Sequence, residues 1–313
     1  MSSLYDRLEI APAVAAALRD GRPIVALEST LISHGLPYPQ NLDVAKASEA
    51  AVVAGGAVPA TIAVRDGKLR VGLEAADLEA LATAPAGSVR KAARPSLAAA
   101  FTEGGWAATT VSATMIAAHA AGITVFATGG IGGVHRGALG SAAGGPPPSF
   151  DVSSDLEELS RTAMVVVCAG PKAILDVPAT LEYLETRGVP VVAVGQDDIP
   201  GFFARSLGIP APASVPDLAA AAELARMHLG LGLGGAILVC VPVPEQAALP
   251  APIARDAIER SIAEADAVAI TGPELTPWLL ARIADLTSGA SVRANVELIV
   301  NNARAATEIA TRV

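Results

Sequence analysis

Short apolar runs recur along the chain at intervals that leave room for a helix between them. Each run is continuously apolar, whereas a strand with one wet face alternates between apolar and polar residues. Continuous apolarity indicates strands buried on both faces, which is typical of a largely parallel sheet. The predicted strands are residues 23–27, 123–128, 164–169, 189–195, 236–243 and 267–270.

Segments rich in Ala, Leu, Glu and Arg lie between these runs, and their apolar residues have helical spacing. The predicted helices are residues 42–54, 109–121, 173–187, 216–229, 252–265, 276–286 and 293–310. This alternation predicts a layered α/β/α fold. Residues 61–73 instead predict a small β-hairpin, because Asp66 and Gly67 suit the two positive-φ positions of a tight turn. The central sheet is therefore predicted to be mixed and largely parallel.

No repeat or change of composition divides the chain, so we predict a single α/β domain over residues 1–313. Segment 137–149 is rich in Gly, Ala and Pro and lacks periodicity, which predicts a flexible loop.

Composition and charge narrow the range of partners. The net charge of −9 argues against nucleic acid or an anionic membrane as the partner, because both favour basic surfaces. Cys168 and Cys240 lie in apolar runs, where cysteine packs as a small hydrophobe. Together with an N-terminus that lacks the apolar core of a signal peptide, they predict a cytoplasmic protein.

Polar residues follow several of the predicted strands, and ligands of open α/β sheets gather beyond the carboxyl ends of strands. Lys172, one of four lysines, follows a buried strand, where poor solvation favours the neutral amine needed to attack a carbonyl carbon. Alternatively, its stem covers apolar surface while the amine reaches water. Glu28 also follows a strand, and it is either a general acid with a raised pKa or a cap for the next turn.

The segment "TGGIGGVHRG", residues 128–137, has two interpretations as well. Its backbone amides and His135 could surround an anion, or its glycines could permit tight packing. Its spacing is not that of a dinucleotide-binding loop or a P-loop.

Residues 150–159 hold two carboxylates near a predicted helix start. Asp151 could bind Mg²⁺ or Mn²⁺ and Asp155 could contact substrate, or Ser153 or Ser154 could simply cap the helix. Lys91, near Arg90 and Arg94, belongs to a solvated basic patch or supplies positive charge for a phosphate.

Several of these segments together resemble the pseudouridine-5′-phosphate glycosidases, a family that includes indigoidine synthase A-like proteins. The resemblance covers most of the chain. It is carried by residues 25–41, 56–73, 109–138, 150–162, 166–176, 180–192 and 276–303, which include "VALESTLISHGLPYPQN" and "VVCAGPKAILD".

The resemblance implies a metal-dependent homotrimer that cleaves the C–C glycosidic bond of pseudouridine 5′-phosphate, reversibly, to uracil and ribose 5-phosphate. It implies Glu28 as proton donor, Lys172 as the nucleophile that forms a Schiff base, and Asp151 as ligand of a divalent metal, with Mn²⁺ expected. The implied substrate-binding residues are Lys91, Val111, Ser153, Ser154, Asp155, His135 and Asn295.

The chain departs from the family pattern within residues 92–96, where Ala93, Pro95 and Ser96 replace the residues usual after the binding lysine, and in the longer segment 137–149. Two alternatives therefore stay open. One is a Schiff-base aldolase or lyase acting on another sugar phosphate, and the other is a non-catalytic nucleotide-binding homologue.

Overall fold

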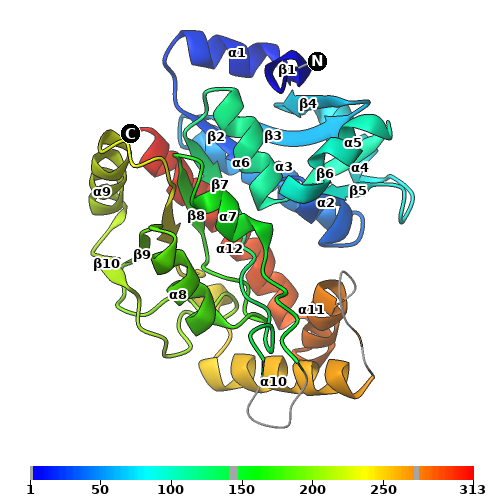
Figure 1. Ribbon diagram of the computed structural model, residues 1–313, viewed down its shortest axis with the longest axis vertical. Helices are drawn as coiled ribbons and strands as arrows, with labels where there is room; N and C mark the ends of the chain where they lie inside the picture. The colour runs from blue at the N-terminus through cyan, green and yellow to red at the C-terminus, as the bar shows by residue number, and fades with distance from the viewer. Residues whose placement is uncertain (1–2, 141–146, 269, 271–274) are drawn as a thin grey trace.

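Five of the six predicted apolar runs form neighbouring strands of a mixed, largely parallel sheet, as expected (Figure 1). The computed structural model describes residues 3–140, 147–268, 270 and 275–313. Within these residues the strands are β1 (Leu8–Ile10), β2 (Ile24–Leu27), β3 (Val58–Arg65), β4 (Lys68–Val71), β5 (Arg90–Ala92), β6 (Trp106–Thr109), β7 (Val125–Ala127), β8 (Val165–Cys168), β9 (Val191–Val194), β10 (Ala213–Val215) and β11 (Ile237–Cys240). Their order is β1-β4-β3-β2-β7-β8-β11-β9-β10, with β6 paired to β3 and β5 paired to β6.

Helices cover the sheet on both faces, which confirms the layered α/β/α prediction. They are α1 (Pro12–Arg19), α2 (Thr30–His34), α3 (Gln40–Ala54), α4 (Ala75–Ala82), α5 (Leu97–Thr102), α6 (Val111–Ala120), α7 (Ser154–Leu159), α8 (Val177–Thr186), α9 (Leu218–Gly230), α10 (Ala251–Ala267), α11 (Leu275–Leu286) and α12 (Ala290–Ala310). Short 3₁₀ helices occupy Tyr5–Arg7, Arg94–Ser96 and Glu245–Ala247.

Alternate residues of the central strands lie on opposite faces of the sheet and pack in two separate hydrophobic cores. Val25 and Leu27 of β2 pack on the face covered by α3, α9, α10 and α12, whereas Ile24 and Ala26 pack on the face covered by α1, α6, α7 and α8. In Figure 1, α12 runs along one face of the sheet and α6 and α7 lie on the other. Burial on both faces explains why these strands are continuously apolar.

The predicted hairpin is also confirmed. β3 and β4 are antiparallel with Arg65 opposite Lys68, and the turn residues Asp66 and Gly67 have φ of 49° and 76°. The antiparallel pairs β3–β4 and β3–β6 make the sheet mixed.

One predicted strand is wrong. Residues 267–270 were expected to extend, yet Ala267 ends α10, Val268 is its C-cap, and the backbone N–H of Ile270 donates to the carbonyl of Ala265. Residue 269 lies outside the described residues. Four apolar residues are too few to distinguish a strand from the end of an amphipathic helix.

The segment predicted as a loop, 137–149, is only partly described, because residues 141–146 lie outside the described residues. Residues 137–140 and 147–149 contain neither helix nor strand.

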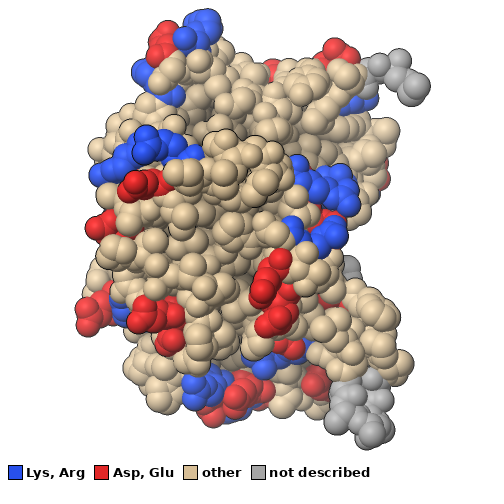
Figure 2. Space-filling model, turned by 60° about the vertical axis from the view of Figure 1, so that its left-hand side comes forward, with Lys and Arg blue, Asp and Glu red and all other residues tan. Residues whose placement is uncertain are grey.

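The described helices include none with the length and apolar character required to cross a bilayer. On the face shown in Figure 2, charged side chains of both signs form small separate groups around a broad uncharged area.

Candidate active site

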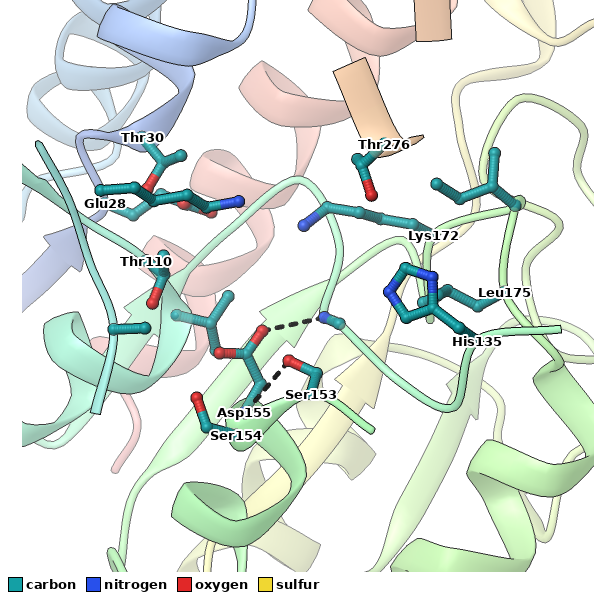
Figure 3. Close-up of a pocket in the computed structure, with 15 residues that line it drawn as sticks. Glu28, Thr30, Thr110, His135, Ser153, Ser154, Asp155, Lys172, Leu175 and Thr276 are labelled. Atoms are coloured by element: carbon teal, nitrogen blue, oxygen red, sulfur yellow. Dashed lines mark hydrogen bonds between the residues drawn. The ribbon is translucent and has the colours of Figure 1, made fainter. Parts of the chain in front are cut away.

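A polar cavity of about 180 Å³ lies beyond the carboxyl ends of β2, β7 and β8. It brings together most of the residues predicted as functional, from segments far apart in the sequence (Figure 3). The predicted residues that line it are Glu28, Lys91, Val111, His135, Ser153, Ser154, Asp155 and Lys172. Thr30, Ala93, Thr110, Gly132, Ile174, Leu175 and Thr276 complete the lining.

Glu28 is positioned by the end of β2 and by its neighbour β7. Leu27 and Ala127 are register partners, so the next residues, Glu28 and Thr128, also lie side by side, and the Thr128 hydroxyl donates a hydrogen bond to the carboxylate of Glu28. The N-cap of α2 is Ser29, so Glu28 is not the cap of that turn. Burial raises the pKa of Glu28, while the positive charge of Lys172 and the Thr128 hydrogen bond oppose that rise.

Lys172 is positioned by two loops that pair with each other after β7 and β8. The backbone N–H of Lys172 donates to Ile131, and the N–H of Ile131 donates to Gly170, at 3.1 and 3.2 Å. Lys172 is partly buried, and in Figure 3 its side chain extends into the cavity toward the side on which Glu28 lies. It does not begin a helix, because α8 starts at Val177 with Asp176 as its cap. Lys172 therefore faces the cavity, which disagrees with the alternative that its amine extends to bulk water.

Lys91 enters the cavity from β5, at the edge of the sheet. Its pKa is lowered, first by burial and then by the positive charge of Lys172, whereas Glu28 and Asp155 act in the opposite direction. An incoming anion would favour the charged form of Lys91.

Ser153, Ser154 and Asp155 come from the start of α7. Ser153 is the N-cap and accepts a hydrogen bond from the N–H of Asp155. Asp155 is buried, and its two oxygens accept from the backbone N–H groups of Ser112 and Gly132 at 3.0 and 2.9 Å. This carboxylate therefore joins α6, α7 and the loop after β7.

Two predicted residues lie outside this cavity lining. Asn295 is inside α12, because that helix begins at Ala290, and it lines a separate cavity with His34 and Phe203. Asp151 has an exposed side-chain fraction of 48%, and its Oδ2 lies 3.9 Å from Nδ1 of His135, which does line the cavity.

Metal binding can be judged from the donor set at Asp151. Among the described residues, no group of three or more His, Cys, Asp or Glu side chains converges as a metal site would require. A hard divalent cation at Asp151 would thus take one protein carboxylate and fill its shell with water and substrate oxygens, which suits Mg²⁺ or Mn²⁺ better than Zn²⁺. The donor set fits such a loosely held cation.

Sequence reasoning missed Thr110, Gly132 and Thr276. Thr110 directly follows β6, which runs opposite to β2, so its place near Glu28 depends on the antiparallel pairing of β6 with β3, which the local sequence does not show. Gly132 lies within the glycine-rich segment that was noted. Thr276 lies at the start of α11, and nothing in its local sequence marks it.

The fold and the cavity together define an α/β enzyme that holds a small polar substrate at the carboxyl edge of a mixed sheet. A model of the indigoidine synthase A-like proteins matches residues 13–312. The chain belongs to that family.

Relatives with assigned names are similar over nearly the full length. A pseudouridine-5′-phosphate glycosidase of Paracoccus denitrificans is 53% identical, with 97% of each chain covered. One from Rhodospirillum centenum is 54% identical over 98% of this chain and 92% of the relative. The crystal structure of the prealnumycin C-glycosynthase AlnA in complex with ribulose 5-phosphate superposes with a TM-score of 0.87 at 37% identity, covering 97% of this chain and 96% of that one.

Proposed function

We propose that this chain is a pseudouridine-5′-phosphate glycosidase, which reversibly cleaves the C1′–C5 bond between ribose 5-phosphate and uracil. The observation that carries the proposal is the entry of Lys172 into the cavity that Glu28 lines, beside the hydroxyls of Thr110, Ser153 and Ser154. An amine, a carboxylic acid and a hydroxyl-rich end are the groups that a Schiff-base reaction on a sugar phosphate requires. Full-length relatives of that name support the same activity.

The leaving atom of this reaction is C5 of uracil. Because this carbon has no lone pair, a proton cannot bind to it before the C1′–C5 bond breaks, and the bonding electrons need another acceptor at C1′. In the proposed first step, the neutral amine of Lys172 bonds to C1′ as the C1′–O4′ bond breaks, and O4′ takes the proton of Glu28. The nitrogen then loses a proton, which restores its lone pair. That pair forms a C1′=N iminium as the C1′–C5 bond breaks, and C5 keeps the bonding electrons and takes up a proton.

Water completes the cycle by adding to the iminium, which releases ribose 5-phosphate and returns the free amine. The raised pKa of Glu28 suits the first step, because it keeps the acid protonated to higher pH than an exposed glutamate. His135 lines the same cavity and is assigned the later proton transfers. Asp155 is assigned to positioning instead, because backbone N–H groups already occupy both of its oxygens.

The phosphate is assigned to the end of the cavity formed by Ser153, Ser154, Thr110 and Lys91. The backbone of Val111 opens α6 at this point, and a helix N-terminus favours an anion. Asn295 lines the neighbouring cavity, so it would bind the substrate only if the two cavities joined.

We further propose that Mn²⁺ binds at Asp151, where its charge would offset that of the phosphate. The proposed assembly is a homotrimer, which rests on the family resemblance. Light scattering would then give three times the 31.3 kDa of one chain. A cytoplasmic location is proposed because Cys168 and Cys240 are both free and buried.

The test is incubation of the protein with pseudouridine 5′-phosphate and Mn²⁺, with free uracil as the readout. Lys172→Ala should abolish uracil release, whereas Lys46→Ala, on the exposed surface of α3, should not change it. Borohydride with ribose 5-phosphate should attach the sugar to Lys172, and peptide mass spectrometry would locate it.

Other outcomes would favour the alternatives. An adduct on Lys172 without uracil release would indicate an aldolase or lyase acting on another sugar phosphate. Ligand binding with neither an adduct nor turnover would indicate a non-catalytic homologue. An adduct on a lysine other than Lys172 would contradict the mechanism.

A further inference from the structure

An ion pair with one buried partner lies behind the cavity, outside its lining: the side chain of Arg94 is 38% exposed, and that of Glu158 is buried. Glu158 of α7 is only 2% exposed, and its carboxylate accepts hydrogen bonds from the guanidinium of Arg94 and the hydroxyl of Thr162. Arg94 begins the 3₁₀ helix that follows β5. Burying the carboxylate of Glu158 is costly, and an ion pair with a partly exposed arginine returns little of that cost. The pair is therefore better explained by the geometry it fixes.

That geometry concerns two walls of the cavity. The segment of Arg94 also carries Lys91 and Ala93, while the helix of Glu158 carries Ser153 and Ser154 at its start, and all four residues line the cavity. The ion pair thus joins the wall that holds the lysine to the wall that holds the serines.

Ser112 provides a second link between the same walls. It is fully buried in α6, and its Oγ accepts from the backbone N–H of Arg94 at 3.1 Å. The same Oγ lies 3.3 Å from Oγ of Ser154 and 3.2 Å from Oγ1 of Thr110. The backbone N–H of Thr110 in turn donates to the carbonyl of Ala92 at 2.8 Å. The hydroxyls facing the cavity are therefore oriented from behind by the segment that carries the ion pair.

We propose that Arg94 and Glu158 are positioning residues for phosphate recognition. They hold Lys91 and the α7 serines at the separation that a phosphate monoester needs, and so they favour the 5′-phosphate of the substrate over the unphosphorylated nucleoside. This inference rests on the proposed function and deepens it. Groups that bind a ligand must be held to a fraction of an ångström by supporting contacts, and a displacement of about 1 Å can cost about a hundredfold.

A matched control lies on the same strand. Arg90 is about as exposed as Arg94, at 40% against 38%, but its partner Glu103 is 50% exposed whereas Glu158 is buried. Arg90→Gln therefore removes an ion pair from β5 without disturbing the connection to α7, and it should leave ligand binding within about twofold of wild type.

The test variant is the double substitution Arg94→Gln with Glu158→Gln, because removing Arg94 alone would leave the buried carboxylate of Glu158 without its charged partner. Calorimetry should show ribose 5-phosphate bound about 10- to 100-fold more weakly. The ratio of kcat/KM for pseudouridine 5′-phosphate to kcat/KM for pseudouridine should fall by a similar factor, chiefly through KM of the phosphorylated substrate. Wild-type affinity for ribose 5-phosphate would overturn the proposal, and so would equal losses of kcat/KM for both substrates.

A further variant, Arg94→Lys, covers a failure of the double variant to fold. Arg94→Lys keeps the charge but loses the planar guanidinium, so it should fold and weaken ribose 5-phosphate binding by a smaller factor. Unchanged binding in a folded Arg94→Lys protein would overturn the proposal. If the wild-type protein released no uracil, the proposed function would fail, yet the ribose 5-phosphate binding comparison would still decide the role of Arg94 and Glu158.

Discussion

Gly132 is the position at which the smallest possible change should damage the site most. An added Cβ would lie 2.2 Å from Oγ of Ser153 and 2.8 Å from Oδ2 of Asp155. The backbone N–H of Gly132 also donates a hydrogen bond to Oδ2 of Asp155, at 2.9 Å. The φ of Gly132 is not in the positive region, so alanine would bring no backbone strain and the effect of Gly132→Ala would be purely steric.

The size of the effect follows from these contacts. Overpacking in a site that cannot move costs about 1–3 kcal/mol. Asp155 is 5% exposed and cannot turn to water, so weakening its charge-assisted hydrogen bond adds about 1–2 kcal/mol. We therefore expect Gly132→Ala to lower the free energy of unfolding by about 2–5 kcal/mol. Because Ser153 and Asp155 must shift, kcat/KM should fall at least about tenfold.

Urea unfolding and uracil release measure these two quantities. Gly230→Ala is the matched control, because no described atom beyond its chain neighbours and its own helix backbone lies within 4 Å of the added Cβ, and its φ is also not positive. Alanine at the end of α9 should be neutral or stabilising by up to about 1 kcal/mol. If Gly132→Ala unfolded at the wild-type urea concentration and released uracil at the wild-type rate, the contacts at Gly132 would not position the site as argued.

Three further predictions concern the acid, the core and the metal. Because burial raises the pKa of Glu28 above its ordinary 4.5, its contribution to stability is present below pH 4.5 and lost as pH rises through the raised pKa. Likewise kcat/KM of the wild type should fall as pH rises through that raised pKa. Glu28→Gln should remove the pH dependence of unfolding and abolish uracil release, because the amide cannot act as the acid. Phe126→Ala should lower the free energy of unfolding by about 3–5 kcal/mol in urea, because the ring is fully buried; a loss below about 1 kcal/mol would contradict that packing. Asp151→Asn should abolish Mn²⁺ binding seen by electron paramagnetic resonance, and unchanged binding would place the metal elsewhere.

The central sheet was predictable from sequence because its strands are buried on both faces. β8 and β11 contain only residues with no exposed surface, and such burial produces an apolar run that stands out in the sequence. The short strands β1, β5, β6 and β10 were missed. β5, for example, consists of Arg90, Lys91 and Ala92, and it is a strand only because β6 lies beside it. Short edge strands of this kind form because of pairing partners that are distant in sequence, and the local sequence pattern does not reveal those partners.

The candidate site was predictable where one residue follows one buried strand, as with Glu28 and Lys172. It was not predictable where a position depends on several segments at once. The sequence places Arg94 only in a basic cluster, because the buried Glu158 that it contacts lies 64 residues further along the chain. The start of α6 was predicted two residues early, since Thr109 belongs to β6, and this hid Thr110 as a residue at a strand end.

The glycine-rich segment 128–137 illustrates how packing can be mistaken for ligand binding in a sequence. A loop that surrounds an anion must leave its backbone N–H groups free for it. Here the N–H groups of Ile131, Gly132, Val134 and His135 donate to protein oxygens of Gly170, Asp155, Thr180 and Asp151. An added Cβ at Gly130 would lie 2.9 Å from the carbonyl oxygen of Gly170, and one at Gly133 would lie 2.5 Å from Oγ1 of Thr180. The glycines therefore let this loop pack against the loop of Lys172 and against α7 and α8. Their effect on catalysis is indirect, since this packing determines where the amine of Lys172 points.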